Sequence, residues 1–213
     1  MVSISQDTKN GNHFKEVIKK NIPVVFFDRA CEDVDVSKVL IDDQNSAYNA
    51  VKHLLEKGYK KIAHFAGPKT LDICKKRFKG YVSAMNDSEM EIDKQLIVYG
   101  GLHESDGYNA MDALIKKNYL PDAIFAVNDP VAIGAYQKIK EAGLKIPGDV
   151  AVVGFSNNRV SNLVEPQMTT ISQPSYEMGK KAAEILIEKI KNKKNIRNEV
   201  VVLTANLIVR GST

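Results

Sequence analysis

The sequence predicts an α/β protein with parallel β-sheets, and three observations support this prediction. Short apolar segments alternate with segments whose apolar residues recur at helical spacing. The apolar segments are unbroken rather than alternating, which is typical of strands buried on both faces. Several of them stop abruptly at polar residues or at glycine and proline, as at Asn128 and at Gly67. Helices that cover both faces of a parallel sheet account for all three observations.

The expected strand–helix units follow one another from the N-terminus. Strands are expected to end at Asp28, at Asp42–Asp43 and at Gly67–Pro68, and a further strand lies within residues 95–101. All but the first lead into a segment in which apolar side chains recur three or four residues apart, as in an amphipathic helix. The apolar faces of these helices contain Ala47, Val51, Leu54 and Leu55; Cys74, Phe78, Tyr81, Val82 and Met85; and Tyr108, Met111, Leu114 and Ile115.

Residues 123–127 form the next expected strand, which stops at a polar corner. We expect Asp129 to cap the following helix and Pro130 to take its first position, where the missing N–H of proline costs nothing. The helix should run to Gly143, because glycine commonly ends helices. Asn128 either closes the turn or presents its amide beyond the carboxyl end of the strand, where ligands bind in open α/β sheets. The spacing alone leaves both interpretations open.

The last part of the chain departs from this alternation. The segment DVAVVGFSNN, residues 149–158, predicts another buried strand, and a long amphipathic helix is expected from about Pro174 to Asn192. Two short strands joined around Ala205–Asn206 should follow. The lysine-rich segment 189–195 is interpreted as a solvated turn rather than as a DNA-binding patch.

The composition indicates a protein with a sizeable core. The chain has 213 residues, of which 44% are hydrophobic, enough for one large domain or two small ones. Its net charge of +4 is too mild and dispersed to mark a nucleic-acid surface. Cys31 and Cys74 suggest no disulfide framework, and without a signal-peptide-like start we expect a reducing cytosol. No apolar run approaches the ~18 residues that span a bilayer, so no membrane partner is expected.

Signatures of common enzyme classes are missing from the sequence. It contains neither the phosphate loop G-x-x-x-x-G-K-[ST] nor the dinucleotide fingerprint G-x-G-x-x-G. Residues 154–158 contain the first half of a nucleophile elbow without its second glycine. The four histidines lack the spacing of metal ligands; they are His13, His53, His64 and His103. We therefore expect no enzyme activity, no catalytic residues, no metal and no cofactor.

Several stretches, taken together, have a family resemblance. Most of it lies in PDAIFAVNDPVAIGAYQKIKEAGLKIPGDVAVVGFSNN, residues 121–158, and EPQMTTISQPSYEMGKKAAEILIEKI, residues 165–190. The upstream segments IPVVFFDR, GYKKIAHFAGP and KKRFKGYVSAM follow in the matching order. Over essentially its whole length the chain resembles the effector-binding core of the LacI/GalR family of bacterial transcription regulators.

The resemblance implies two Rossmann-like subdomains of periplasmic-binding-protein-like (type I) architecture, with the ligand in the cleft. Residues 1–43 and 172–195 would form the N-terminal subdomain, and residues 44–171 and 196–213 the C-terminal one. In family members a helix-turn-helix headpiece, a hinge helix and two further strand–helix units precede the strand that resembles residues 1–5. The N-terminal subdomain is therefore expected to be incomplete in this chain.

The resemblance also implies particular ligand contacts. Asp28 matches an acidic contact of the N-terminal subdomain, and Gln173 matches a glutamine at the cleft edge. Arg77 matches an arginine that grips hydroxyls or a carboxylate, a task that suits its planar fork of donors. Asn128 matches an asparagine of the cleft.

Two departures from the family pattern concern the chemistry of the ligand. Ser156 stands where many sugar-binding members have an aspartate, and a hydroxyl is a weaker acceptor than a carboxylate. Leu102 lies near a position where relatives place an aromatic platform, so sugar stacking is weakened. Ser156 is still expected to contact the ligand, and Leu102, Phe155 and Asn157 are expected to line the cleft.

The expected function is therefore the effector-binding domain of a cytoplasmic transcription regulator with a sugar-like effector. It would form a homodimer and contact operator DNA only through the headpiece. The alternative is a periplasmic sugar-binding transport receptor of the same fold. A doubly wound enzyme is the third possibility, but it requires a nucleophile–base pair or a metal cluster.

Overall fold

The chain folds into two compact units. The computed structural model describes residues 1–8, 10–192 and 197–213, so part of the lysine-rich segment 189–195 lies outside the described residues. The first unit comprises residues 1–42, 70–73 and 173–205. The second unit comprises residues 43–69, 74–172 and 206–213.

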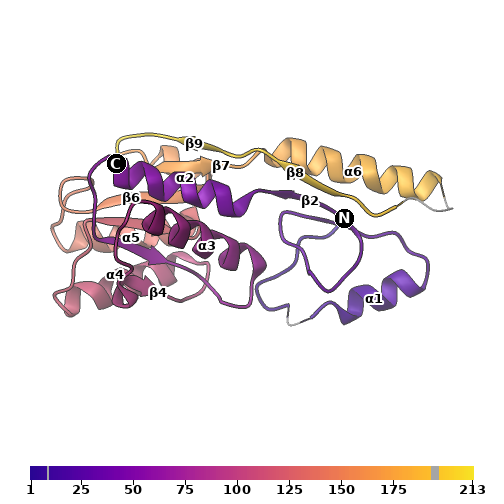
Figure 1. Ribbon diagram of the computed structural model, residues 1–213, viewed down its shortest axis with the longest axis horizontal. Coiled ribbons are helices and arrows are strands. Elements are labelled where there is room, and N and C mark those ends of the chain that lie inside the picture. The colour runs from indigo at the N-terminus through magenta and orange to yellow at the C-terminus, as the bar shows by residue number, and fades with distance from the viewer. Residues whose placement is uncertain (9, 193–196) are drawn as a thin grey trace. The chain divides into compact units, whose positions relative to one another are not determined.

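The first unit contains a small parallel sheet. Its strands, in spatial order, are β1 (Val25–Phe27), β2 (Ser37–Ile41) and β8 (Val200–Leu203). Val2 forms an isolated parallel bridge with Phe26, next to β1. Helix α6 (Ser175–Lys191) packs on β1 and β2 and runs beside β8 (Figure 1). Helix α1 (Asn12–Lys19) contributes Phe14, whose ring centroid lies 5.0 Å from that of Phe26.

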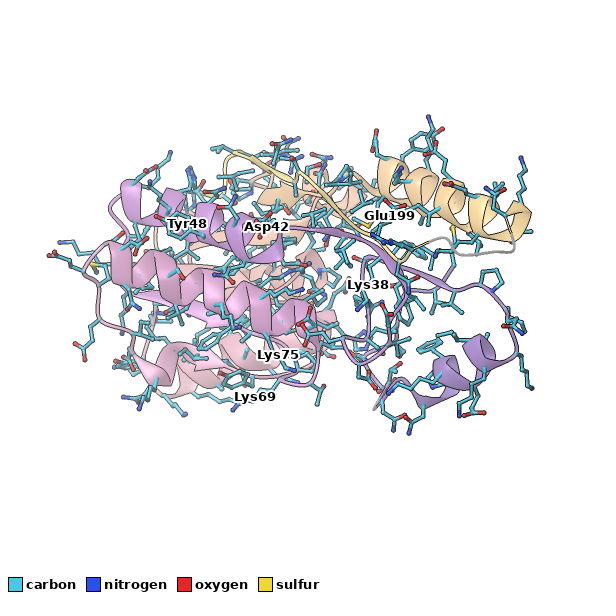
Figure 2. The ribbon with its side chains drawn as sticks, turned by 45° about the vertical axis from the view of Figure 1, so that its right-hand side comes forward. Lys38, Asp42, Tyr48, Lys69, Lys75 and Glu199 are labelled. Carbon is cyan, nitrogen blue, oxygen red and sulfur yellow. The ribbon has the colours of Figure 1, made fainter. Side chains whose placement is uncertain are left out.

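Strand β8 corrects one sequence-based boundary. The N–H of Lys38 donates to the carbonyl of Glu199 over 2.8 Å, and the two side chains are labelled on neighbouring segments in Figure 2. The assignment of residues 196–213 as a whole to the second subdomain was wrong for β8. The β-branched run at residues 200–202 completes the sheet of the first unit, and the chain enters the second unit only at Asn206.

The second unit contains a larger sheet of order β4-β3-β5-β6-β7-β9. The first five strands in this order are parallel and the last is antiparallel. The strands are β3 (Ile62–Phe65), β4 (Ile97–Val98), β5 (Ala123–Ala126), β6 (Ala151–Ser156), β7 (Thr169–Ser172) and β9 (Asn206–Ile208). The helices are α2 (Asp43–Glu56), α3 (Asp72–Asp87), α4 (Glu104–Lys116) and α5 (Asp129–Glu141), with short 3₁₀ helices η1 (Lys94–Leu96) and η2 (Arg159–Asn162).

The core of the second unit explains why its strands are unbroken apolar runs. Every residue of β3 and β5 is buried, because helices cover the sheet. Helices α4 and α5 approach closely at Gly134, where an added Cβ would lie only 1.8 Å from the carbonyl oxygen of Glu104. The expected α/β class with parallel sheets is confirmed, as is the order of the strand–helix units.

Candidate functional site

The carboxyl ends of the parallel strands of the second unit carry the candidate site. Because β3, β5 and β6 are neighbours and run in the same direction, their last residues share one edge of the sheet. Asn128 follows β5 after one buried residue, Val127, and Ser156 is the last residue of β6. Ligands bind at this edge in open α/β sheets.

Asn128 is held by hydrogen bonds at both ends of its amide. Its Oδ1 accepts from the N–H of Val131 over 2.9 Å, and its Nδ2 donates to the carbonyl of Leu102 over 2.9 Å. Asn128 is therefore the N-cap of α5, and the prediction that Asp129 takes this role was wrong. The half-buried amide keeps one N–H and one lone pair beyond these two bonds. Closing the turn and contacting a ligand are thus compatible.

Asp129 is a buried anchor rather than a cap. Its carboxylate accepts from the N–H of Asn158 and from the hydroxyl of Thr170, both over 2.6 Å. Gly154 makes room for it, since a Cβ there would lie 2.2 Å from Oδ1. Burial raises the pKa of Asp129, while these hydrogen bonds partly oppose the shift. The carboxylate therefore ties the segment after β6 to the start of β7.

Arg77 is restrained by a carboxylate, a backbone carbonyl and an aromatic ring. Its Nε donates to Oδ1 of Asp43 over 2.8 Å, and its Nη2 lies 2.7 Å from the same oxygen. Its Nη1 donates to the carbonyl of Val127 over 2.6 Å. The guanidinium carbon lies 3.5 Å from the ring centroid of Phe155, which is fully buried. The ring of Phe155 therefore packs against the guanidinium of Arg77 and is not exposed to solvent.

The end of β6 has an uncommon backbone. Ser156 has φ 125° and Asn157 has φ 53°, values that few residues other than glycine adopt. The side chain of Asn157 is engaged on both atoms: Nδ2 donates to Ser172 over 3.2 Å, and Oδ1 accepts from Arg210 over 2.9 Å. This fixed turn presents the half-buried Ser156 at the sheet edge.

The remaining expected contacts belong to the first unit. Asp28 follows β1 with φ 61°, accepts from the hydroxyl of Ser3 over 3.2 Å and lies 3.6 Å from Nε of Arg29. Gln173 is the first residue of the chain after its crossing from β7 and is half-buried. The structure thus brings Arg77, Asn128 and Ser156 into one unit, and it places Asp28 and Gln173 in the other.

One residue of the candidate site was missed by sequence reasoning. Asp43 was interpreted only as the end of a strand, and its pairing with Arg77 has no local signal in the sequence. His64, one of the four histidines without the spacing of metal ligands, is a structural residue: it is fully buried in β3, with Nδ1 3.0 Å from the carbonyl of Phe125 and its ring stacked near Phe78 and Tyr81. Burial lowers the pKa of His64 to about 4.

Neither a metal cluster nor a membrane span is found in the described part of the chain. Residues 1–8, 10–192 and 197–213 contain no group of three or more His, Cys, Asp or Glu side chains placed to hold a metal ion. Within the same residues, no helix combines the length and the apolar character that crossing a membrane requires.

Comparison with known proteins identifies the family. A model of the periplasmic binding protein-like domain matches residues 51–213. The chain belongs to this family. It is 33% identical over 191 residues to the HTH-type transcriptional repressor CytR of Escherichia coli (strain K12). The alignment covers 90% of this chain and 56% of CytR, so the chain spans about half the length of the curated relatives it matches.

Solved structures of this family have the same fold. The transcriptional regulator CelR in complex with cellobiose superposes with a TM-score of 0.88 at 30% identity, over 97% of this chain and 64% of CelR. A LacI family regulator of Enterococcus faecium with bound ribose gives a TM-score of 0.86 at 25% identity, over 96% of this chain and 77% of that protein. The resemblance to LacI-family effector-binding cores, and the type I architecture it implied, are confirmed. These relatives are transcription regulators rather than enzymes.

Proposed function

We propose that this chain is the effector-binding part of a LacI-type transcription regulator. Its ligand is a small sugar-like molecule that contacts Arg77, Asn128 and Ser156 in the second unit and Asp28 and Gln173 in the first. Operator DNA is bound by a helix-turn-helix headpiece, the regulator works as a cytoplasmic homodimer, and the chain catalyses no reaction.

The observation that carries this proposal is the restraint of two different polar groups at one sheet edge. Arg77 and Asn128 are each fixed by at least two hydrogen bonds within the second unit, and each keeps donors that these bonds do not use. A planar fork and an amide so fixed suit a ligand that offers several oxygen atoms in a set geometry. The bound cellobiose and ribose in two similar regulators are ligands of this kind.

The test uses the complete product of the gene that encodes this chain. Fluorescence anisotropy measures its binding to DNA from upstream of the gene, with and without each of a panel of sugars. At least one sugar should change the affinity for DNA by about fivefold or more, the usual range of coupling between two sites. Arg77→Lys should remove this response while sugar-free DNA binding persists. Sugar binding without any specific DNA binding by the complete product would instead favour a transport receptor.

A further inference from the structure

The carboxylate of Asp43 contacts the guanidinium of Arg77 directly. Both lie in the second unit, and their side chains are 4% and 3% exposed. One carboxylate oxygen, Oδ1, faces both Nε and Nη2 of the guanidinium, at 2.8 and 2.7 Å. Asp43 is also the first residue of α2, so the backbone of that helix fixes where the carboxylate lies.

This contact determines the charge that a ligand meets. An unpaired arginine at a binding site attracts carboxylates and phosphates, because its fork matches their geometry and charge. Here a buried carboxylate already neutralises the guanidinium at hydrogen-bond distance. An anionic ligand group placed against Arg77 would also lie close to Asp43, and like charges in a poorly solvated site repel strongly.

Neutral oxygen atoms do not meet this obstacle. Asp43 and the carbonyl of Val127 use only part of the guanidinium, so donors remain for hydroxyl or ring oxygens of a ligand. The other two expected ligand contacts of the second unit, Asn128 and Ser156, are uncharged, and the carboxylate of Asp129 is buried against Asn158 and Thr170. Lys69 does not supply a free charge here, because it is exposed and directs its Nζ over the ring of Tyr99 at 3.9 Å.

We propose that Asp43 is a specificity-determining residue that makes the site select a neutral polyhydroxylated ligand and reject its phosphorylated or carboxylated counterpart. It acts through Arg77, by holding the guanidinium in place and cancelling its charge. This inference rests on the proposed function for the identity of the site, but the effect of Asp43 on anions can be measured without knowing the effector.

The experiment compares Asp43→Asn with the unaltered chain and with Asp87→Asn. Asp87 is exposed at the far end of α3, so its substitution changes the net charge equally without touching Arg77. Thermal unfolding is followed while inorganic phosphate is titrated against sodium chloride at equal ionic strength. D-ribose and D-ribose 5-phosphate are then compared as a matched neutral and anionic pair.

Asp43→Asn should bind phosphate at least about tenfold more tightly than the unaltered chain, since an unpaired arginine then faces the site. Asp87→Asn should behave as the unaltered chain does. An equal phosphate response in all three proteins would overturn the proposal, because a merely structural role for Asp43 predicts lower stability without a new affinity for anions.

The unaltered chain tests the same proposal if Asp43→Asn does not fold. It should show no stabilisation by phosphate or by D-ribose 5-phosphate beyond that of chloride. Stabilisation by either anion that disappears in Arg77→Gln would contradict the proposal. If no sugar of the panel changes DNA binding by the complete gene product while Asp43→Asn gains phosphate binding, the proposed function fails and the effect of Asp43 on anions stands.

Discussion

Arg77 in the second unit and Asp28 in the first are the two charged side chains expected to contact ligand, and the structure restrains them very differently. The side chain of Arg77 is 3% exposed and contacts a carboxylate, a carbonyl and an aromatic ring. The side chain of Asp28 is 33% exposed and has one hydroxyl donor at 3.2 Å and an arginine at 3.6 Å. A rigid contact fixes the orientation of a ligand, whereas a loosely held carboxylate can adjust to it.

Strands of the two sheets also differ in how far their side chains are buried. All residues of β3 and β5 in the second unit are buried. Strand β8 of the first unit exposes alternate residues, with Val200 and Val202 61% and 57% exposed. Strand β8, at an edge of its sheet, therefore exposes one of its faces, whereas β3 and β5 are interior strands that are buried on both faces.

Removing the charge of Arg77 should have the largest effect on stability. Arg77→Ala leaves Asp43 buried without its cation, which should lower the free energy of unfolding by about 3–5 kcal/mol. Arg29→Ala in the first unit removes a partly exposed ion pair and should cost less than about 1 kcal/mol. Urea denaturation of both variants tests the contrast. Equal losses would mean that the second unit is not the more rigidly organised one.

Acidification should weaken the fold through His64. Its pKa in the fold is about 4, below its ordinary value of 6.5, because burial disfavours the charged ring. As pH falls from 6.5 to about 4, the unfolded chain takes up a proton that the folded chain refuses, so stability decreases across this window. The loss should reach about 3 kcal/mol. Denaturation at several pH values should show a shallower decline in His64→Phe, and an unchanged decline would refute this assignment.

Loss of the cap at Asn128 should have a smaller effect. Asn128→Ala removes the acceptor for the N–H of Val131 and should cost about 0.5–2 kcal/mol. In the first unit, α6 has no side-chain cap, so Ser175→Ala at its first residue should change stability by less than about 0.5 kcal/mol. Thermal denaturation compares the two variants. If Ser175→Ala is as costly as Asn128→Ala, the capping role given to Asn128 is wrong.

The sequence predicted the fold better than the roles of individual side chains. Buried parallel strands leave unbroken apolar runs, so the strand–helix order could be inferred before the structure was available. The N-cap was assigned to Asp129 instead of Asn128 because both residue types cap helices well. Only the tertiary contacts with Asn158 and Thr170 show that the carboxylate is buried.

The strand at residues 200–203 illustrates a similar limit. Its apolar pattern predicts a strand, but nothing local indicates which of two sheets it joins. Asp43 was missed for a related reason, since its partner Arg77 lies 34 positions later in the chain. Such a pairing depends on how α2 and α3 pack against each other, and the apolar pattern of neither helix predicts that packing.

The central claim is that the sheet edge with Arg77, Asn128 and Ser156 binds a small polyhydroxylated ligand. Amide hydrogen exchange of the chain, with and without a neutral sugar selected by thermal shift, tests it most directly. The account predicts slower exchange in the segments around residues 77, 102, 128 and 156, and loss of this protection in Arg77→Lys. Protection confined to other segments, or protection that Arg77→Lys leaves unchanged, would contradict it.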